Sequence, residues 1–297
     1  MVSAAALALA SALCIAIGDV LQQRAAHCIS DRAVGNVELV AKLLRNGRWW
    51  WGALLLVASI ALQAAALGRG SVLLVQALLM LSLLFALPVN ARVWHRSVTG
   101  GEWIWGGLLT AAVIVIVVVG NPQAGRSGAS LGTWVAVAIV LGPPLVACSV
   151  VGRVRGGALA AALFAFVSGS LWGVFAVLTK EVVARLADGG WALARTPELY
   201  ACLLAAAGGV VWSQAAFRAG PLTASMPTLQ MAQPVVAAVL GVVVLGETLH
   251  TGRAGLAALV AAGLVATAAI VKLARVEAAT TRDGVEARGP DPVGQPA

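Results

Sequence analysis

The sequence predicts an all-α, polytopic membrane protein, and its composition and hydropathy pattern carry that prediction. Apolar residues make up 60% of the 297-residue chain and charged residues 11%, against roughly 45–50% and roughly 25% in soluble domains. The apolar residues gather in nine uncharged or nearly uncharged stretches of about 20 residues, the length of a helix that crosses a bilayer. This pattern excludes a soluble enzyme, a disordered protein and, despite the net charge of +8, a nucleic-acid binder.

The predicted spans follow one another from the N-terminus to a polar tail. They cover residues 3–23, 51–67, 71–91, 103–120, 131–151, 158–178, 199–217, 221–245 and 254–271. The first has no Lys or Arg before it and closes on Asp19, Gln22 and Gln23, so we expect a retained span rather than a signal peptide. Residues 276–297 mix charged residues with Gly and Pro without periodicity, which predicts a disordered tail.

The distribution of Lys and Arg predicts the orientation in the membrane. The loops after the first, third, fifth and seventh spans, together with the C-terminal residues after the ninth span, hold 14 of the 20 basic residues, and the other loops hold 6. Positively charged loops stay in the cytoplasm, so we expect the N-terminus outside the plasma membrane and the C-terminus inside. The four cysteines show no CxxC pair, so we expect no disulfide framework, zinc site or other cofactor.

Two sequence motifs recur in the same order in the two halves of the chain. Residues 63–70 and 214–220 each begin with Gln-Ala-Ala and end in Gly. A Gly-Glu-x-x-x-x-Gly motif follows one span later in each half, with Glu102 in the first copy and Glu247 in the second. A repeat explains both matches, and chance similarity between sequences rich in small residues is the alternative.

The predicted repeat divides the chain into four spans, a linking span and four more spans. The first repeat covers residues 1–120, the linking span and its loops 121–157, and the second repeat 158–275. Matching spans are five apart, an odd number, so the two repeats have opposite orientations in the bilayer. Inverted repeats of this kind are typical of secondary transporters, which bind their substrate between the repeats.

Asp19 is the only acid or base that we place within a span. An ionised side chain at that depth costs several kcal/mol, so it is usually paired or lines a wet path. We expect it to couple a cation or proton or to contact a substrate ammonium, with Gln22 and Gln23 beside it at i+3 and i+4. The alternative is a structural residue that reaches the interface and pairs with Arg24 or Lys42.

Five glutamines lie inside apolar spans, where each amide needs a partner in the bundle or in a cavity. They are Gln63, Gln76, Gln214, Gln230 and Gln233. The last two are one helical turn apart between Pro227 and Pro234, which predicts a kinked or broken span. Freed carbonyls and amides at mid-membrane are typical of a substrate site, and hydrogen bonding between helices is the alternative.

Other residues within the spans and at their ends are expected to have supporting roles. We expect Ser168, Ser170 and Trp172 to line the same cavity, although Trp is also common as packing. Glu102 and Glu247 are expected in the first turn of the helix that follows each, where the helix dipole favours a carboxylate. Lys180 ends its span and is expected to reach the outer interface.

Several short motifs resemble the drug/metabolite transporter superfamily of EamA-like transporters. They are Gly-Pro-Leu-Thr-Ala-Ser-Met-Pro at 220–227, Gln233-Pro234 and Leu245-Gly246-Glu247. The chain looks most like the branch that contains NIPA-type magnesium transporters. That likeness lies in Gly18-Asp-Val-Leu-Gln-Gln-Arg24, Trp49-Trp50, Ser168-Gly-Ser170 with Lys180, and the nine-span plan. The resemblance implies a membrane carrier of the drug/metabolite transporter type.

The sequence therefore predicts a secondary transporter of a small molecule or ion that works by alternating access. No Walker-type phosphate loop is present, and the spans hold no catalytic triad, paired carboxylates or His cluster, so we expect no ATPase or other enzyme. Magnesium transport is one alternative, with Asp19 as the metal ligand. A non-transporting membrane scaffold or subunit is another. The surface, rich in small residues, is compatible with a homodimer.

Overall fold

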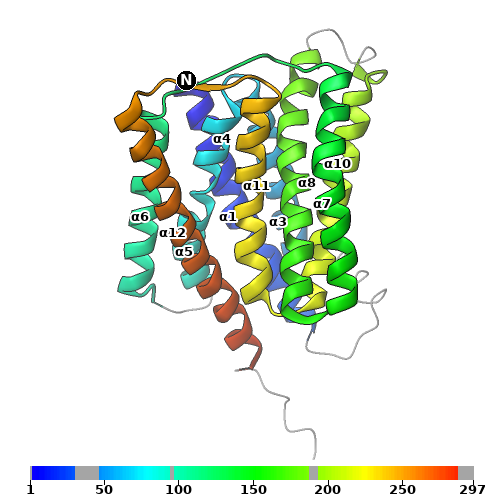
Figure 1. Ribbon diagram of the computed structural model, residues 1–297. Coiled ribbons are helices and arrows are strands. Elements are labelled where there is room, and N and C mark those ends of the chain that lie inside the picture. Colours follow the sequence, from blue (N-terminus) through cyan, green and yellow to red (C-terminus); the bar gives the residue numbers. More distant parts are fainter. Residues whose placement is uncertain (1, 31–46, 94–96, 187–192, 287–297) are drawn as a thin grey trace, which may run out of the picture.

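The computed structural model describes residues 2–30, 47–93, 97–186 and 193–286, which form a bundle of long helices (Figure 1). The helices are α1 (Val2–Ser30), α3 (Gly47–Leu67), α4 (Val72–Leu79), α5 (Ser82–Val93), α6 (Gly100–Val118), α7 (Leu131–Arg155), α8 (Gly157–Leu186), α10 (Pro197–Ala219), α11 (Leu222–Val243) and α12 (Arg253–Glu286). The described ranges also contain two short strands, β1 (Pro122–Gln123) and β2 (Thr248–Leu249).

Nine helical segments of the described ranges are long and apolar enough to cross a membrane, which confirms the predicted number of spans. Eight are single helices, and α4 with α5 forms the ninth. The outside of the bundle is apolar, and α7 in particular exposes Leu131, Ile139 and Val154. Because large apolar side chains on that scale are stable only against other apolar groups, this surface fits a lipid environment. The protein is an all-α, multi-pass membrane protein.

Successive spans run in alternating directions, so α1 begins at one end of the bundle and α12 ends at the other (Figure 1). The end at which α1 begins is the N-terminal end of the bundle. The connections α3–α4, α6–α7 and α11–α12 lie at this same end. α12 extends past the opposite end.

The packing of α8 against α11 depends on two glycines of α8. A Cβ on Gly169 would lie 2.8 Å from the carbonyl oxygen of Leu229, and one on Gly173 would lie 2.9 Å from that of Gln233. The two glycines are four residues apart and therefore share a face of α8, an arrangement that lets two helix backbones approach closely in membranes. The sequence analysis did not identify this small-residue pair, which fixes where α11 places its glutamines.

Of the kink or break predicted in the proline-containing span, the break is wrong, because α11 continues as a helix through Pro227 and Pro234. The span that is interrupted is instead the third one, which is divided into α4 and α5 at Met80 and Leu81. There the backbone N–H of Leu81 donates to the Leu78 carbonyl at 3.1 Å, an i−3 rather than an i−4 partner. Proline removes only one backbone donor, and tightly packed neighbours retain the helix around it.

The disordered tail is predicted from residue 276, whereas α12 remains helical as far as Glu286. A helix that is already formed adds residues at little cost, and this stretch includes Glu277, Ala278 and Ala279, which favour helix. The remainder of the predicted tail, 287–297, lies outside the described residues.

A short antiparallel ribbon joins the two halves of the chain at the N-terminal end of the bundle. β1, from the α6–α7 connection, pairs with β2, from the α11–α12 connection. Beside the ribbon, the backbone N–H of Arg126 donates to the carbonyl of Leu245 at 2.7 Å. Gly125 has no room for a Cβ, which would lie 2.1 Å from the same carbonyl oxygen. Gly246 has a φ of +65°, which favours glycine.

Candidate functional site

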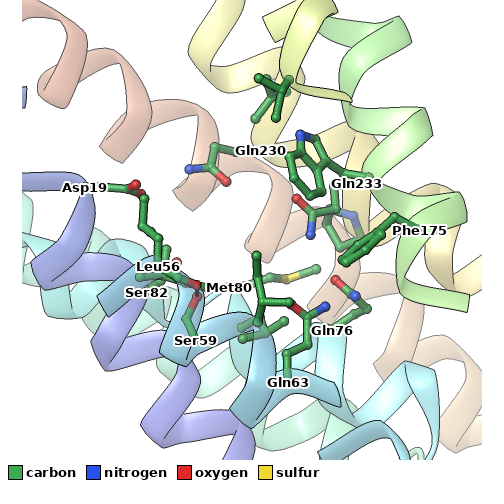
Figure 2. A pocket seen from close by; sticks show the side chains of 17 residues that line it. Asp19, Leu56, Ser59, Gln63, Gln76, Met80, Ser82, Phe175, Gln230 and Gln233 are labelled. Carbon is green, nitrogen blue, oxygen red and sulfur yellow. Dashed lines mark hydrogen bonds between the residues drawn. The ribbon is translucent and has the colours of Figure 1, made fainter. Parts of the chain in front are cut away.

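A cavity of about 410 Å³ lies inside the bundle, and Figure 2 shows the side chains that line it. Its walls come from α1, α3, α4, α5, α8, α10 and α11, so both halves of the chain contribute. The structure brings together six of the predicted site residues here, with one of the predicted structural prolines. They are Asp19, Gln63, Gln76, Trp172, Gln230, Gln233 and Pro234. The volume is within the range of small-molecule sites, roughly 300–1,000 Å³.

Gln63 on α3 and Gln76 on α4 bring two buried amides to one side of the cavity (Figure 2). Their side chains are 7% and 3% exposed. Neither Nε2 atom has a hydrogen-bond partner among the described residues. A buried donor without a partner costs roughly 1–3 kcal/mol. These two amides are therefore unusual in a folded interior, and a bound acceptor would relieve that cost.

Gln230 and Gln233 project from α11 into the same cavity (Figure 2). They are three residues apart and share a face of the helix. Pro234 has no backbone N–H, so the Gln230 carbonyl lacks its usual partner one turn along α11. This wall therefore offers two half-buried amides and a freed carbonyl oxygen.

Trp172 and Phe175 of α8 form an aromatic wall of the cavity, with ring centroids 5.4 Å apart in an edge-to-face arrangement. The indole lies against Gly209 of α10, where a Cβ would be 2.9 Å from the ring. The Ser168 hydroxyl donates to the carbonyl of Gly209 at 2.7 Å and ties α8 to α10 at that point. Ser168 therefore supports the wall without lining the cavity.

Four of the predicted binding residues are not among the described residues that line the cavity. Ser170 is buried and donates to the Phe166 carbonyl of its own helix at 2.7 Å. Gln214 is exposed on α10, so the expectation that every amide faces the interior fails there. Its place near the end of α10 allows the amide to reach polar surroundings. The side chains of Gln22 and Gln23 lie outside the described residues.

A buried ion pair at the N-terminal end of the bundle was missed by the sequence analysis. Lys180 of α8 donates to Glu247 with Nζ 2.6 Å from Oε1, and their side chains are 7% and 0% exposed. The expectation that Lys180 reaches the outer interface is therefore wrong, because α8 continues past it to Leu186 and the side chain is buried against Glu247. An ion pair was hard to foresee because its partners are 67 residues apart in the chain.

Glu247 also binds the start of α4. Its two carboxylate oxygens accept from the backbone N–H groups of Val72 at 2.6 Å and Leu73 at 3.0 Å. The expected position in the first turn of the following helix is wrong, since α12 begins only at Arg253. The helix dipole still explains the contact, because the carboxylate satisfies exposed N–H groups at the N-terminus of a different helix.

Glu102, the equivalent residue of the first half, behaves as predicted. It lies in the first turn of α6 and forms a capping box with Thr99. The Thr99 backbone N–H donates to the Glu102 carboxylate at 2.6 Å, and the Glu102 N–H donates to the Thr99 hydroxyl at 3.3 Å. The two Gly-Glu motifs therefore both cap helices, one within its own segment and one across the bundle.

Glu181, next to Lys180, is a second buried charge in α8. Its carboxylate accepts from the Trp134 indole N–H at 3.0 Å and from the backbone N–H of Ala129 at 2.9 Å. Together with Lys180 it corrects the inference that Asp19 is the only acid or base within a span. The contact joins α8 to the start of α7, which packs mainly on α8.

Comparisons with known proteins identify a relative but no described family or structure. No protein-family model matches the chain, and no solved structure matches it. An uncharacterized protein of Corynebacterium glutamicum is 36% identical over 247 residues, which cover 81% of this chain and 83% of that protein. At that identity and coverage, the chain belongs to the same family as this corynebacterial protein.

Proposed function

We propose that this protein is a secondary transporter of the drug/metabolite transporter type, which moves a small solute across the plasma membrane by alternating access. The observation that carries the proposal is the cavity within the bundle, which is lined from both halves of the chain. It contains two buried amide donors that have no partner among the residues that the structure describes. Ordinary helix packing leaves such groups paired. A bound solute that completes their hydrogen bonds accounts for them.

The proposal includes the inverted repeat expected from the sequence, and the contacts between helices at corresponding positions support it. α1 packs on α3 in the first half as α8 packs on α10 in the second. Helices that match each other across the halves also meet directly, as α6 with α12 and α4 with α11. A two-fold relation between the halves predicts such pairs. Transporters with inverted repeats hold their substrates between the repeats, and the cavity here is lined from both halves of the chain.

The magnesium alternative has less support from the cavity. Mg²⁺ prefers carboxylate oxygens and retained water molecules. Among the described residues, Asp19 is the one carboxylate that lines the cavity, and no group of three or more His, Cys, Asp or Glu side chains is placed to hold a metal ion. The cavity offers mainly amides, aromatic rings and aliphatic groups, which suit an organic solute.

Transport is tested with purified protein in liposomes and labelled amines, amino acids and Mg²⁺. We expect the wild-type chain to carry one of these solutes. Gln230→Leu and Gln233→Leu should each raise the apparent KM about tenfold, equivalent to about 1.4 kcal/mol, because each removes a polar contact in the cavity. The protein should still fold, because an interhelical hydrogen bond in a membrane averages only about 0.6 kcal/mol.

Gln214→Leu is the matched control, because it removes the same amide from an exposed position outside the cavity. It should leave the KM unchanged. Equal effects of all three substitutions would place the site elsewhere. Absence of flux for every solute in a well-folded preparation would favour the scaffold alternative.

The proposed orientation places the N-terminal end of the bundle outside the cell. Ser127, exposed in the α6–α7 connection at this end, provides a position for a label. In a chain whose four native cysteines are replaced by serine, we expect Ser127→Cys to react with a membrane-impermeant maleimide in intact cells. Restoring Cys28 alone should give labelling only after lysis. The reverse pattern would invert the orientation.

A further inference from the structure

We infer that the cavity recognises a small organic solute through a neutral carbonyl oxygen, as in a carboxamide, which accepts hydrogen bonds from the side-chain amides of Gln63 and Gln76. The inference rests on the proposed function and adds the chemical class of the substrate. It follows from the two buried amides, from the residues around them and from the aromatic wall of the cavity.

The side chains of Gln63 and Gln76 favour a ligand that accepts hydrogen bonds. Both line the cavity, and they are 7% and 3% exposed. Neither Nε2 atom has a hydrogen-bond partner among the residues that the structure describes. Figure 2 shows the two amides on the same side of the cavity, one from α3 and the other from α4. A carbonyl oxygen has two lone pairs, so one such oxygen can accept from both side chains.

The group that these amides bind is neutral. An ammonium group or a metal ion has no acceptor to offer to an amide nitrogen, so a cation satisfies neither Nε2 atom. An anion would be poorly compensated, because no Lys, Arg or His is among the described residues that line the cavity. Asp19 also lines the cavity but has an interaction of its own, so we assign no charge to the ligand from it. Among neutral groups, a carbonyl oxygen accepts two hydrogen bonds and adds no donor.

The aromatic wall fits a flat, apolar body attached to the carbonyl group. Trp172 and Phe175 meet edge to face with centroids 5.4 Å apart, and both line the cavity. An aromatic ligand gains stacking or edge contacts with such rings beyond the area that it buries. Met80 adds a flexible thioether to the lining. The cavity of about 410 Å³ has room for a bicyclic aromatic solute.

The same two amides should lower the stability of the protein without ligand, because a buried donor without a partner is unfavourable. Leucine in place of glutamine removes the donor and roughly keeps the volume. We therefore expect the double variant Gln63→Leu with Gln76→Leu to raise the midpoint of thermal unfolding by at least about 2 °C in the absence of ligand. Amides that only held the bundle together would have the opposite effect on removal.

Four indole derivatives test the carbonyl preference by isothermal titration calorimetry on the purified full-length protein. Indole-3-acetamide carries the neutral carbonyl group. 3-Ethylindole lacks it, indole-3-acetate replaces it with an anion, and tryptamine replaces it with a cation; at about pH 7 the acid is ionised and the amine is protonated. Titrations into detergent alone are subtracted. We expect indole-3-acetamide to bind at least about tenfold more tightly than each of the other three.

Variants assign this preference to the two amides. The double variant Gln63→Leu with Gln76→Leu should remove the advantage of indole-3-acetamide over 3-ethylindole and leave the binding of 3-ethylindole unchanged. Each single substitution should remove part of it, which keeps the test available if the double variant does not fold. Asp19→Asn should retain the advantage, and so should Gln214→Leu, since Gln214 is not among the described residues that line the cavity. Each variant must elute as a single species in size-exclusion chromatography.

Other outcomes overturn the inference. Binding of indole-3-acetate or tryptamine as tight as that of indole-3-acetamide would show that the group recognised is charged. Wild-type selectivity with a lower unfolding temperature in the double variant would give the amides a structural role. If no probe binds while Gln230→Leu still impairs the flux of another solute, the substrate class is wrong and the transporter remains. If indole-3-acetamide binds with the expected selectivity but no solute is carried in liposomes, the ligand class holds and the proposed transport fails.

Discussion

Glu247→Gln is expected to lower the midpoint of thermal unfolding by about 10 °C, the largest stability effect of any single substitution considered. The substitution leaves the Lys180 ammonium buried without its counter-charge, which costs about 3–5 kcal/mol for a pair of this kind. It also replaces one of the two carboxylate oxygens that accept from the start of α4. The loss should appear when purified protein is heated in detergent and unfolding is followed by tryptophan fluorescence.

The double variant Lys180→Met with Glu247→Gln separates charge from packing. It removes both charges, so it should recover much of the stability that Glu247→Gln alone loses. Glu198→Gln is the comparison variant, because Glu198 pairs with Arg185 at 2.9 Å and the pair is open to solvent on the arginine side, with side chains 47% (Arg185) and 13% (Glu198) exposed. Pairs open to solvent contribute about 0–1 kcal/mol, so this variant should lose much less stability than Glu247→Gln.

The position of Glu247 outside the cavity sets a second expectation. Glu247→Gln should weaken binding of a cavity ligand far less than it lowers stability. Equal unfolding temperatures for Glu247→Gln and Glu198→Gln would contradict a structural role for the buried pair. Loss of ligand binding in a stable Glu247→Gln protein would move the site to the N-terminal end of the bundle.

Gly173→Ala is expected to impair both folding and binding, because the new methyl group meets the backbone of α11. The added Cβ would lie 2.9 Å from the carbonyl oxygen of Gln233 and 3.0 Å from the backbone nitrogen of Ala237. Overpacking of this kind costs about 1–3 kcal/mol. Separation of α8 and α11 would also shift Gln233 in the cavity. A lower unfolding temperature and a higher KM in the liposome assay should therefore occur together.

Gly107→Ala is the control for Gly173→Ala. Gly107 is a helical glycine of α6, and a Cβ there would meet nothing within 4 Å. Alanine favours helix over glycine by about 0.5–1 kcal/mol, so this variant should be neutral or slightly more stable. If Gly173→Ala behaved like Gly107→Ala, the close approach of α8 and α11 would not be required for the cavity.

The sequence by itself determined the fold class and the number of spans, because both follow from the composition of contiguous segments. A bilayer has a fixed thickness, so apolar stretches of sufficient length identify crossing helices without knowledge of their neighbours. The polar groups in the middle of the spans could be predicted from the sequence for the same reason. Six of the predicted site residues, including Gln230 and Gln233, do line one cavity. Whether that cavity binds a substrate stays a prediction.

The tertiary structure decided which polar groups face one another and how the ends of the spans are used. Lys180 lies in a polar stretch from which the end of a span is predicted. In the structure α8 continues past this stretch, and Lys180 is buried against Glu247. Gln214 has the same side chain and a similar apolar context to Gln63, yet it faces outward. The sequence pattern indicates which residues share a face of a helix. Which other helix that face contacts depends on how helices far apart in the chain pack together. That packing depends here on glycines such as Gly169 and Gly173, whose close contacts involve residues some 60 positions away in the chain.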